Sequence, residues 1–195
     1  MLTESDIPEE TKRLLQIIQQ HDPSAAIVGG YLRDLAAGVK PKDVDIFITR
    51  AGLRSLLGSW QGMTPLVLEG YGGGAMRAEV AEVWEYSPLM PFPLPVQIIV
   101  LREPLPLSEV IHRVDFDFCR VGYGGTGKLL LGHGFEAAIS TRTATYCGPD
   151  DPKQLARSAR RVRRWETRFT GWRFLRPAGR WGEMRVAFHP EMTHP

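Results

Sequence analysis

Hydrophobic residues in the first third of the chain switch between helical and strand spacing. Leu14, Leu15 and Ile18 recur at three- and four-residue intervals behind a proline and two glutamates, which is typical of a helix and its N-terminus. Residues 43–49 instead alternate apolar with acidic or aromatic side chains, as a half-buried strand does. The elements expected in this part are helices at 8–21, 31–37 and 51–58, and strands at 25–28, 43–49 and 66–68.

The middle of the chain is predicted to be mostly strand and the last quarter mostly helix. The expected strands lie at 75–86, 96–101, 114–121 and 128–131, with a short helix at 108–113. After a helix start at Asp151-Pro152, apolar residues step by three or four along one face, namely Leu155, Ala159, Val162, Trp165, Phe169 and Trp172. The arginines expected on the opposite side are Arg157, Arg160, Arg161, Arg164 and Arg168. This order predicts an α+β domain at 1–149, followed by a basic helical segment and tail at 150–195.

Composition places the chain among soluble globular proteins. Its 195 residues are 43% hydrophobic and 24% charged, and its longest apolar stretch, near 96–101, is far shorter than a membrane span. The acidic N-terminus does not resemble a signal peptide. Two cysteines are too few for a disulfide framework or a zinc knuckle, so we expect a cytoplasmic protein without membrane contact.

Charge is concentrated near the C-terminus. The formal net charge is +2, but residues 153–185 hold eleven Lys or Arg against Glu166 and Glu183. Such a block is consistent with a polyanionic partner such as nucleic acid, and equally with a solvated helix face.

A glycine-rich segment has the spacing of a phosphate-binding P-loop. In Gly122–Leu129 the sequence reads GYGGTGKL, but leucine stands where a P-loop needs Ser or Thr, and a strand-like run follows in place of a helix. A hairpin turn is therefore the preferred interpretation.

The strongest candidate for chemistry is the segment 28–48. Asp43 and Asp45 are two residues apart on a predicted strand, so both carboxylates point to the same side. They repel each other unless a cation lies between them, and Mg²⁺ prefers such oxygen ligands. Upstream, Gly29-Gly30 joins a strand to a helix, where a phosphate can approach the backbone. Either feature alone is more often a solvated pair or a simple turn, but their order and spacing together favour nucleotidyl transfer.

These residues carry a resemblance to a known family. The pattern G-G-x-x-R-D at 29–34 followed by D-V-D at 43–45 resembles the head domain of the DNA polymerase β-like nucleotidyltransferase superfamily, in its branch of tRNA CCA-adding enzymes and poly(A) polymerases. The resemblance implies a mixed sheet flanked by helices and an activity of the EC 2.7.7 type. It further implies two Mg²⁺ ions at Asp43 and Asp45, with Gly29, Gly30 and Arg33 contacting the phosphates of an NTP. Asp34 is expected to cap the helix or to pair with a basic residue.

The resemblance extends to two later segments. The superfamily often uses a third carboxylate on a neighbouring strand, for which Asp115 and Asp117 both qualify, with a slight preference for Asp115 as catalytic residue and metal ligand. Residues 151–172 look like the neck helix of CCA-adding enzymes, whose E-D-x-x-R motif reads the incoming base. Here Gln154 stands at the arginine position, which departs from the family pattern. The remaining residues expected to bind nucleotide or acceptor are Arg157, Arg160 and Arg164.

Three functions remain in contention. The favoured hypothesis is a minimal nucleotidyltransferase that extends an RNA 3′ end, with the basic helix binding the RNA. The second keeps the chemistry but transfers the nucleotide to a protein or small molecule. The third is a non-catalytic nucleotide- or RNA-binding module, against which the retained aspartates argue. Preferred NTP, number of nucleotides added and oligomeric state do not follow from the sequence.

Overall fold

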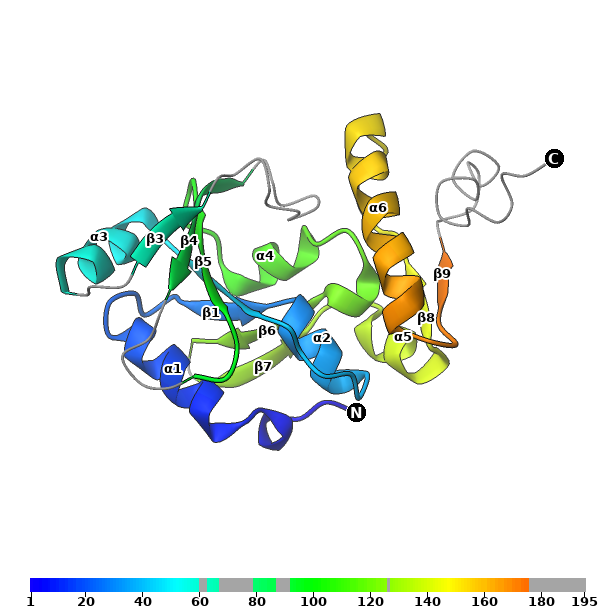
Figure 1. Cartoon of the computed structure of the whole chain (residues 1–195), viewed down its shortest axis with the longest axis horizontal. Helices are drawn as coiled ribbons and strands as arrows, with labels where there is room; N and C mark the ends of the chain where they lie inside the picture. The colour runs from blue at the N-terminus through cyan, green and yellow to red at the C-terminus, as the bar shows by residue number, and fades with distance from the viewer. Residues whose placement is uncertain (60–62, 67–78, 87–91, 126, 176–195) are drawn as a thin grey trace.

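A mixed, mostly antiparallel sheet forms the centre of the molecule (Figure 1). The structure is a computed structural model and describes residues 1–59, 63–66, 79–86, 92–125 and 127–175. Within these residues, seven strands form one sheet in the order β3-β4-β5-β2-β1-β6-β7. Their bounds are Ala26–Val28 for β1, Val44–Ile48 for β2, Met63–Leu66 for β3, Val80–Tyr86 for β4, Val96–Leu101 for β5, Val121–Gly124 for β6 and Lys128–Leu131 for β7. The central pair β2 and β5 is parallel, and the pairs around it are antiparallel.

Helices cover both faces of this sheet. Side chains of α1 (Glu9–Gln19), α2 (Gly30–Ala36) and α3 (Arg50–Ser59) pack with Ile46 and Ile98 on one face. Phe47 and Ile99 point the other way and pack with α4 (Leu107–His112). The alternation along β2 and β5 thus buries both faces, as expected for central strands.

A second core lies at one side of the sheet, where the C-terminal elements gather (Figure 1). It is formed by α5 (Phe135–Thr141), α6 (Pro152–Arg168) and a two-stranded parallel sheet of β8 (Thr143–Thr145) and β9 (Arg173–Leu175). Asp151 caps α6 by accepting a hydrogen bond from the backbone N–H of Gln154 at 2.7 Å, and Pro152 follows at the first helical position. The predicted apolar stripe is confirmed, because Ala159, Val162 and Trp165 are buried in this core.

The expected strand at 114–121 is wrong. Asp117–Cys119 forms a short 3-10 helix, η4, and β6 begins only at Val121. Two observations explain the turn. Phe116 and Phe118 are buried in the second core, and their acidic neighbours Asp115 and Asp117 are buried too, so the segment lacks the solvent-facing side of a half-buried strand. The Asp117 carboxylate accepts hydrogen bonds from the backbone N–H groups of Phe118 at 2.7 Å and Thr145 at 2.8 Å. The strand-like pattern at 114–121 therefore belongs to a turn that is stabilised by hydrogen bonds from a side chain to the backbone.

Other boundaries agree with the sequence more closely. The hairpin interpretation of the glycine-rich segment is confirmed, with β6 and β7 joined by a turn in which Gly125 and Gly127 have φ of 60° and 76°. The expected strand at 75–86 is observed from Val80 onward, and most of the expected strand at 66–68 lies outside the described residues, as does the tail at 176–195. The sequence pattern missed α5, β8 and β9. None of the helices in the described part of the chain has the length and apolar character needed to span a membrane.

Candidate active site

Two aspartates lie together at the start of the central strand β2. Asp43 directly precedes β2 and Asp45 lies within it, while Val44 and Ile46 between and after them are fully buried in the core. Both carboxylates are half-buried on the side away from those apolar residues. Burial, with a further contribution from the negative charge of Asp43, raises the pKa of Asp45 to about 7, although Arg33 opposes the shift. The ionised form of Asp45 is therefore disfavoured in this environment.

This donor set fits Mg²⁺. Carboxylate oxygens are the ligands this ion prefers, and a cation between two half-buried aspartates would relieve their repulsion. No cluster of three or more His, Cys, Asp or Glu side chains that could hold a metal is present among the described residues, so the third carboxylate expected from the sequence does not join the pair there. One or two carboxylates are nevertheless usual for Mg²⁺ when substrate phosphates complete its shell.

The Gly-Gly turn connects β1 to α2 beside this pair. Gly29 has φ +78° and ψ −110°, a backbone conformation that L-residues with side chains rarely adopt. Its N–H donates to the carbonyl of Val121 at 2.9 Å, which ties the turn to β6. The contact of Gly29 and Gly30 with phosphate remains a prediction.

Arg33 is placed differently from the sequence expectation. Its side chain is buried, and its guanidinium donates to the Asp34 carboxylate at 2.6 and 2.9 Å and to Cys119 Sγ at 3.3 Å. The guanidinium carbon lies 5.0 to 5.2 Å from the ring centroids of three aromatic residues, Phe118, Trp165 and Phe169. Arg33 thus connects α2 with α6, and a phosphate contact finds no support in this arrangement.

Asp34 completes the same connection. Its second carboxylate oxygen accepts a hydrogen bond from Arg168 of α6 at 2.6 Å. The expectation that Asp34 pairs with a basic residue is confirmed, and its partners come from both helices.

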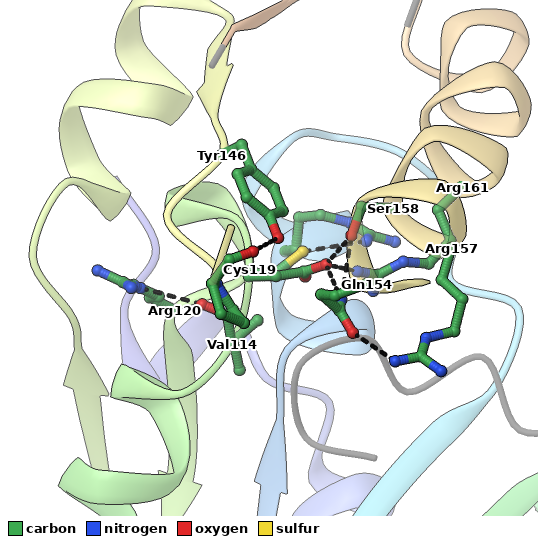
Figure 2. A network of polar contacts seen from close by, with 11 residues as sticks. Val114, Cys119, Arg120, Tyr146, Gln154, Arg157, Ser158 and Arg161 are labelled. Atoms are coloured by element: carbon green, nitrogen blue, oxygen red, sulfur yellow. Dashed lines mark hydrogen bonds and ion pairs between the residues drawn. The ribbon is translucent and has the colours of Figure 1, made fainter. Parts of the chain in front are cut away.

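A polar network joins Asp115 to the N-terminal half of α6 (Figure 2). The carboxylate is 1% exposed, and its Oδ2 accepts hydrogen bonds from Gln154 Nε2 at 3.1 Å, Ser158 Oγ at 2.5 Å and Arg161 Nη2. Gln154 in turn accepts a hydrogen bond on Oε1 from Arg157 Nη2 at 3.1 Å. Asp115 therefore helps to fix the position of α6, and its expected role as a metal ligand remains a prediction.

The arginines of α6 do not all face outward as the sequence predicted. Arg160 and Arg164 are exposed, together with Arg163, but Arg161 and Arg168 reach back to buried carboxylates. Long side chains can do this from the flank of a helix, since their methylene groups cover apolar surface. Sequence reasoning missed Ser158 and Arg161 as partners of Asp115. Ser158 lies four residues after Gln154 and Arg161 three residues after Ser158, so all three share one side of the helix, and this spacing was the available signal.

The charge of Arg33 affects both Asp45 and the Cys119 thiol. The positive charge of Arg33 offsets part of the rise in the pKa of Asp45. Burial raises the pKa of the Cys119 thiol, and the same Arg33 opposes that shift together with Arg161. Arg33 therefore interacts electrostatically with Asp45 as well as with its hydrogen-bond partners Asp34 and Cys119.

In its fold the chain is similar to solved structures of CCA-adding enzymes and of a tRNA-processing enzyme. The CCA-adding enzyme of Bacillus stearothermophilus in complex with CTP matches with a TM-score of 0.61 at 19% identity, over 93% of this chain and 43% of that chain. The Thermotoga maritima CCA-adding enzyme complexed with tRNA matches with a TM-score of 0.60 at 16% identity, over 93% and 43%. A tRNA-processing enzyme in an apo form gives a TM-score of 0.60 at 18% identity, over 93% and 47%.

These similarities establish the fold, and the chain spans less than half the length of the structures it matches. No family model matches the sequence, and no curated protein sequence matches it.

Proposed function

We propose that this protein is a Mg²⁺-dependent nucleotidyltransferase that moves a nucleoside monophosphate from an NTP to the 3′ hydroxyl of an RNA and releases pyrophosphate. The observation that carries the proposal is the acidic pair at the start of β2, where burial and the nearby charge of Asp43 raise the pKa of Asp45 to about 7. The pair lies in a fold shared with CCA-adding enzymes solved with CTP, with ATP and with tRNA, which supports the substrate classes.

Asp43 and Asp45 would hold the metal, two ions by the family resemblance. When bound, Mg²⁺ neutralises charge on the triphosphate and the leaving pyrophosphate and lowers the pKa of the attacking hydroxyl. The hydroxyl oxygen bonds to the α-phosphorus, the bond from that phosphorus to the oxygen bridging the β-phosphate breaks, and the hydroxyl proton passes to water. The turn at Gly29-Gly30 lets the triphosphate approach the backbone without meeting a side chain. Asp115 and Arg33 keep α6 packed against the rest of the domain.

The RNA acceptor is proposed on the basic outer side of α6. Lys153, Arg160, Arg163 and Arg164 are exposed there, within a helix whose inner arginines are already paired. Several exposed arginine and lysine side chains on one helix can pair with the phosphates of an RNA backbone.

An extension assay tests the proposal. Purified protein is incubated with Mg²⁺, each α-labelled NTP in turn, and a mixed pool of short RNAs and tRNA. Asp43→Ala and Asp45→Ala should each reduce label incorporation by orders of magnitude while leaving the circular dichroism spectrum unchanged. Glu85→Ala, an exposed acid on β4, serves as the matched control and should retain full activity.

Each other outcome points to a rival function. Label that enters protein instead of RNA favours nucleotidylation of a protein. Label in neither, with metal-dependent NTP binding intact, leaves a small-molecule acceptor or a non-catalytic module. Substantial activity in both aspartate variants would refute the metal site.

A further inference from the structure

Gln97 lies beside the acidic pair, on the strand next to it. In the parallel register of β2 and β5, Gln97 is the direct partner of Asp45. Partners in register point to the same face of a sheet, and adjacent strands are about 4.8 Å apart. The next pair along the two strands agrees with this, because Ile46 and Ile98 are also partners and both enter the core on the other face. The Gln97 side chain is therefore one strand away from the Asp45 carboxylate, on the same face of the sheet.

The carboxamide of Gln97 is half-buried and has its hydrogen-bonding capacity to spare. It makes no side-chain hydrogen bond to any of the described residues, although an amide offers two donor hydrogens and an acceptor oxygen. The sheet opens outward from here, since Glu85 of β4, the antiparallel partner of Gln97, is exposed. Gln97 can therefore contact a substrate that is bound over the acidic pair.

Charge around Gln97 restricts the kind of group that it can bind. Its partner on one side is Asp45 and its partner on the other side is Glu85. A phosphate bound at Gln97 would lie next to Glu85 and be repelled by it. A sugar hydroxyl carries no charge and, like the amide, both donates and accepts hydrogen bonds. The surroundings of Gln97 therefore favour a hydroxyl over a phosphate.

The order of the strands separates the two substrates of the proposed reaction. β2, which carries Asp45, lies between β1 and β5. The turn at Gly29-Gly30, where the triphosphate is proposed to bind, follows β1, so it lies on one side of the acidic pair and Gln97 lies on the other. In phosphoryl transfer the attacking and leaving oxygens are roughly in line, on opposite sides of the phosphorus. The acceptor is therefore expected on the β5 side, a step that rests on the proposed function.

We propose that Gln97 hydrogen-bonds the 2′ hydroxyl of the acceptor's terminal nucleotide and makes the protein selective for RNA ends over DNA ends. The attacking 3′ hydroxyl is held at the acidic pair, and the 2′ hydroxyl is on the adjacent carbon of the same ribose. It is therefore within reach of a side chain that is one strand away. The 2′ hydroxyl is the group by which a protein distinguishes RNA from DNA at a given position. Gln97 is thus a specificity-determining residue of the acceptor site.

Transfer to two acceptors of identical sequence tests this inference. One RNA ends in a ribonucleotide and the other in a 2′-deoxynucleotide, and both have a free 3′ hydroxyl. The ratio kcat/KM for each acceptor is measured with the full chain, Mg²⁺ and saturating NTP. The wild type should prefer the ribonucleotide end by about threefold to tenfold, which is the factor that one neutral hydrogen bond contributes.

Variants assign this preference to Gln97. Gln97→Met keeps a similar volume but removes the amide, so kcat/KM for the ribonucleotide end should fall to the value for the deoxynucleotide end, which should not change. Gln97→Ala, a second variant that shortens the side chain, should have the same effect. Both should keep the wild-type preference for NTP over dNTP and the wild-type Mg²⁺ concentration at half-maximal rate. Glu85→Ala alters the other neighbour of Gln97 in register and is the control, which should keep the wild-type acceptor preference.

Three results would overturn the inference alone: equal kcat/KM of the wild type for both ends, a preference that survives both Gln97 variants, or an equal loss with both ends in these variants. A changed ratio of NTP to dNTP use would place Gln97 at the incoming nucleotide instead, and a raised Mg²⁺ requirement would place it at the metal. Absence of transfer to either acceptor by the wild type would overturn the proposed function and this inference with it.

Discussion

Asp34 offers the most direct test of how α6 is attached to the sheet. It is buried, and its two carboxylate oxygens accept hydrogen bonds from Arg33 of α2 and Arg168 of α6. Substitution by alanine leaves the buried Arg33 guanidinium with Cys119 Sγ and three aromatic rings as its interaction partners among the described residues. Removing one partner of a buried ion pair costs about 3–5 kcal/mol, mostly because the remaining charge is unpaired.

The lower end of that range applies to Asp34→Ala. The aromatic rings around Arg33 stabilise its charge by up to about 2 kcal/mol where water is excluded. Arg168 is less buried than Arg33 and also donates to the backbone carbonyl of Lys40. We therefore expect the free energy of unfolding to fall by about 3 kcal/mol, or the melting temperature by roughly 6–12 °C for a chain of this size.

Urea unfolding followed by circular dichroism and tryptophan fluorescence measures this loss. Trp165 packs against Arg33, so its emission also reports whether α6 stays in place. Asp34→Asn retains the shape and should fall between wild type and Asp34→Ala. Glu9→Ala breaks exposed ion pairs with Lys12 and Arg13 and should cost about 0.5 kcal/mol or less. The reasoning is refuted if Asp34→Ala is no more destabilising than Glu9→Ala.

Three further predictions concern the acidic pair, the Gly-Gly turn and the basic helix. In metal-free protein, the pKa of Asp45 is raised from 3.8 to about 7, so the folded state binds the proton more tightly than the unfolded state. The free energy of unfolding should therefore decrease as the pH rises from about 4 to 7, by at most about 4 kcal/mol. Asp45→Asn should remove that pH dependence in thermal unfolding and abolish stabilisation by Mg²⁺, and an unchanged pH profile would contradict the shift. Gly29→Ala should cost about 1–3 kcal/mol in urea unfolding because φ is +78°, with Gly58→Ala, a helical glycine with open space around its Cα, as the control. Arg160→Ala and Arg164→Ala should each reduce the slope of log affinity for RNA against log salt concentration by about 1, and unchanged slopes would exclude phosphate contacts there.

Several elements followed from local patterns in the sequence. The start of α1 behind Pro8, the alternation along β2 and the apolar stripe of α6 were all predicted and are observed. The closeness of Asp43 and Asp45 followed as well, since two-residue spacing on a strand determines which side a side chain takes. In each case the periodicity belongs to one element, so no contact between distant segments is needed to interpret it.

The segment around Asp115 could not be interpreted in the same way. Alternating polar and aromatic residues at 114–121 satisfy the strand pattern, yet Asp115 and Asp117 are buried like the phenylalanines between them, and Asp117 accepts hydrogen bonds from backbone groups as far away as Thr145. Such a turn is stabilised by partners from α6 and β8, and their approach is not visible in the segment itself. For the same reason the short elements α5, β8 and β9 have little periodicity of their own.

The sequence by itself determined the central helices and strands, the acidic pair and the basic character of the last helix. Only the tertiary structure determined which charged side chains are paired inside the protein and which are exposed. Asp115 and Arg161 come from segments 46 positions apart, and Asp34 and Arg168 from segments 134 positions apart. A buried charge is tolerated only when an opposite charge meets it, and that meeting depends on how helices pack against the sheet. Residue type and spacing mark which side chains can do chemistry, whereas packing selects those that hold the fold together.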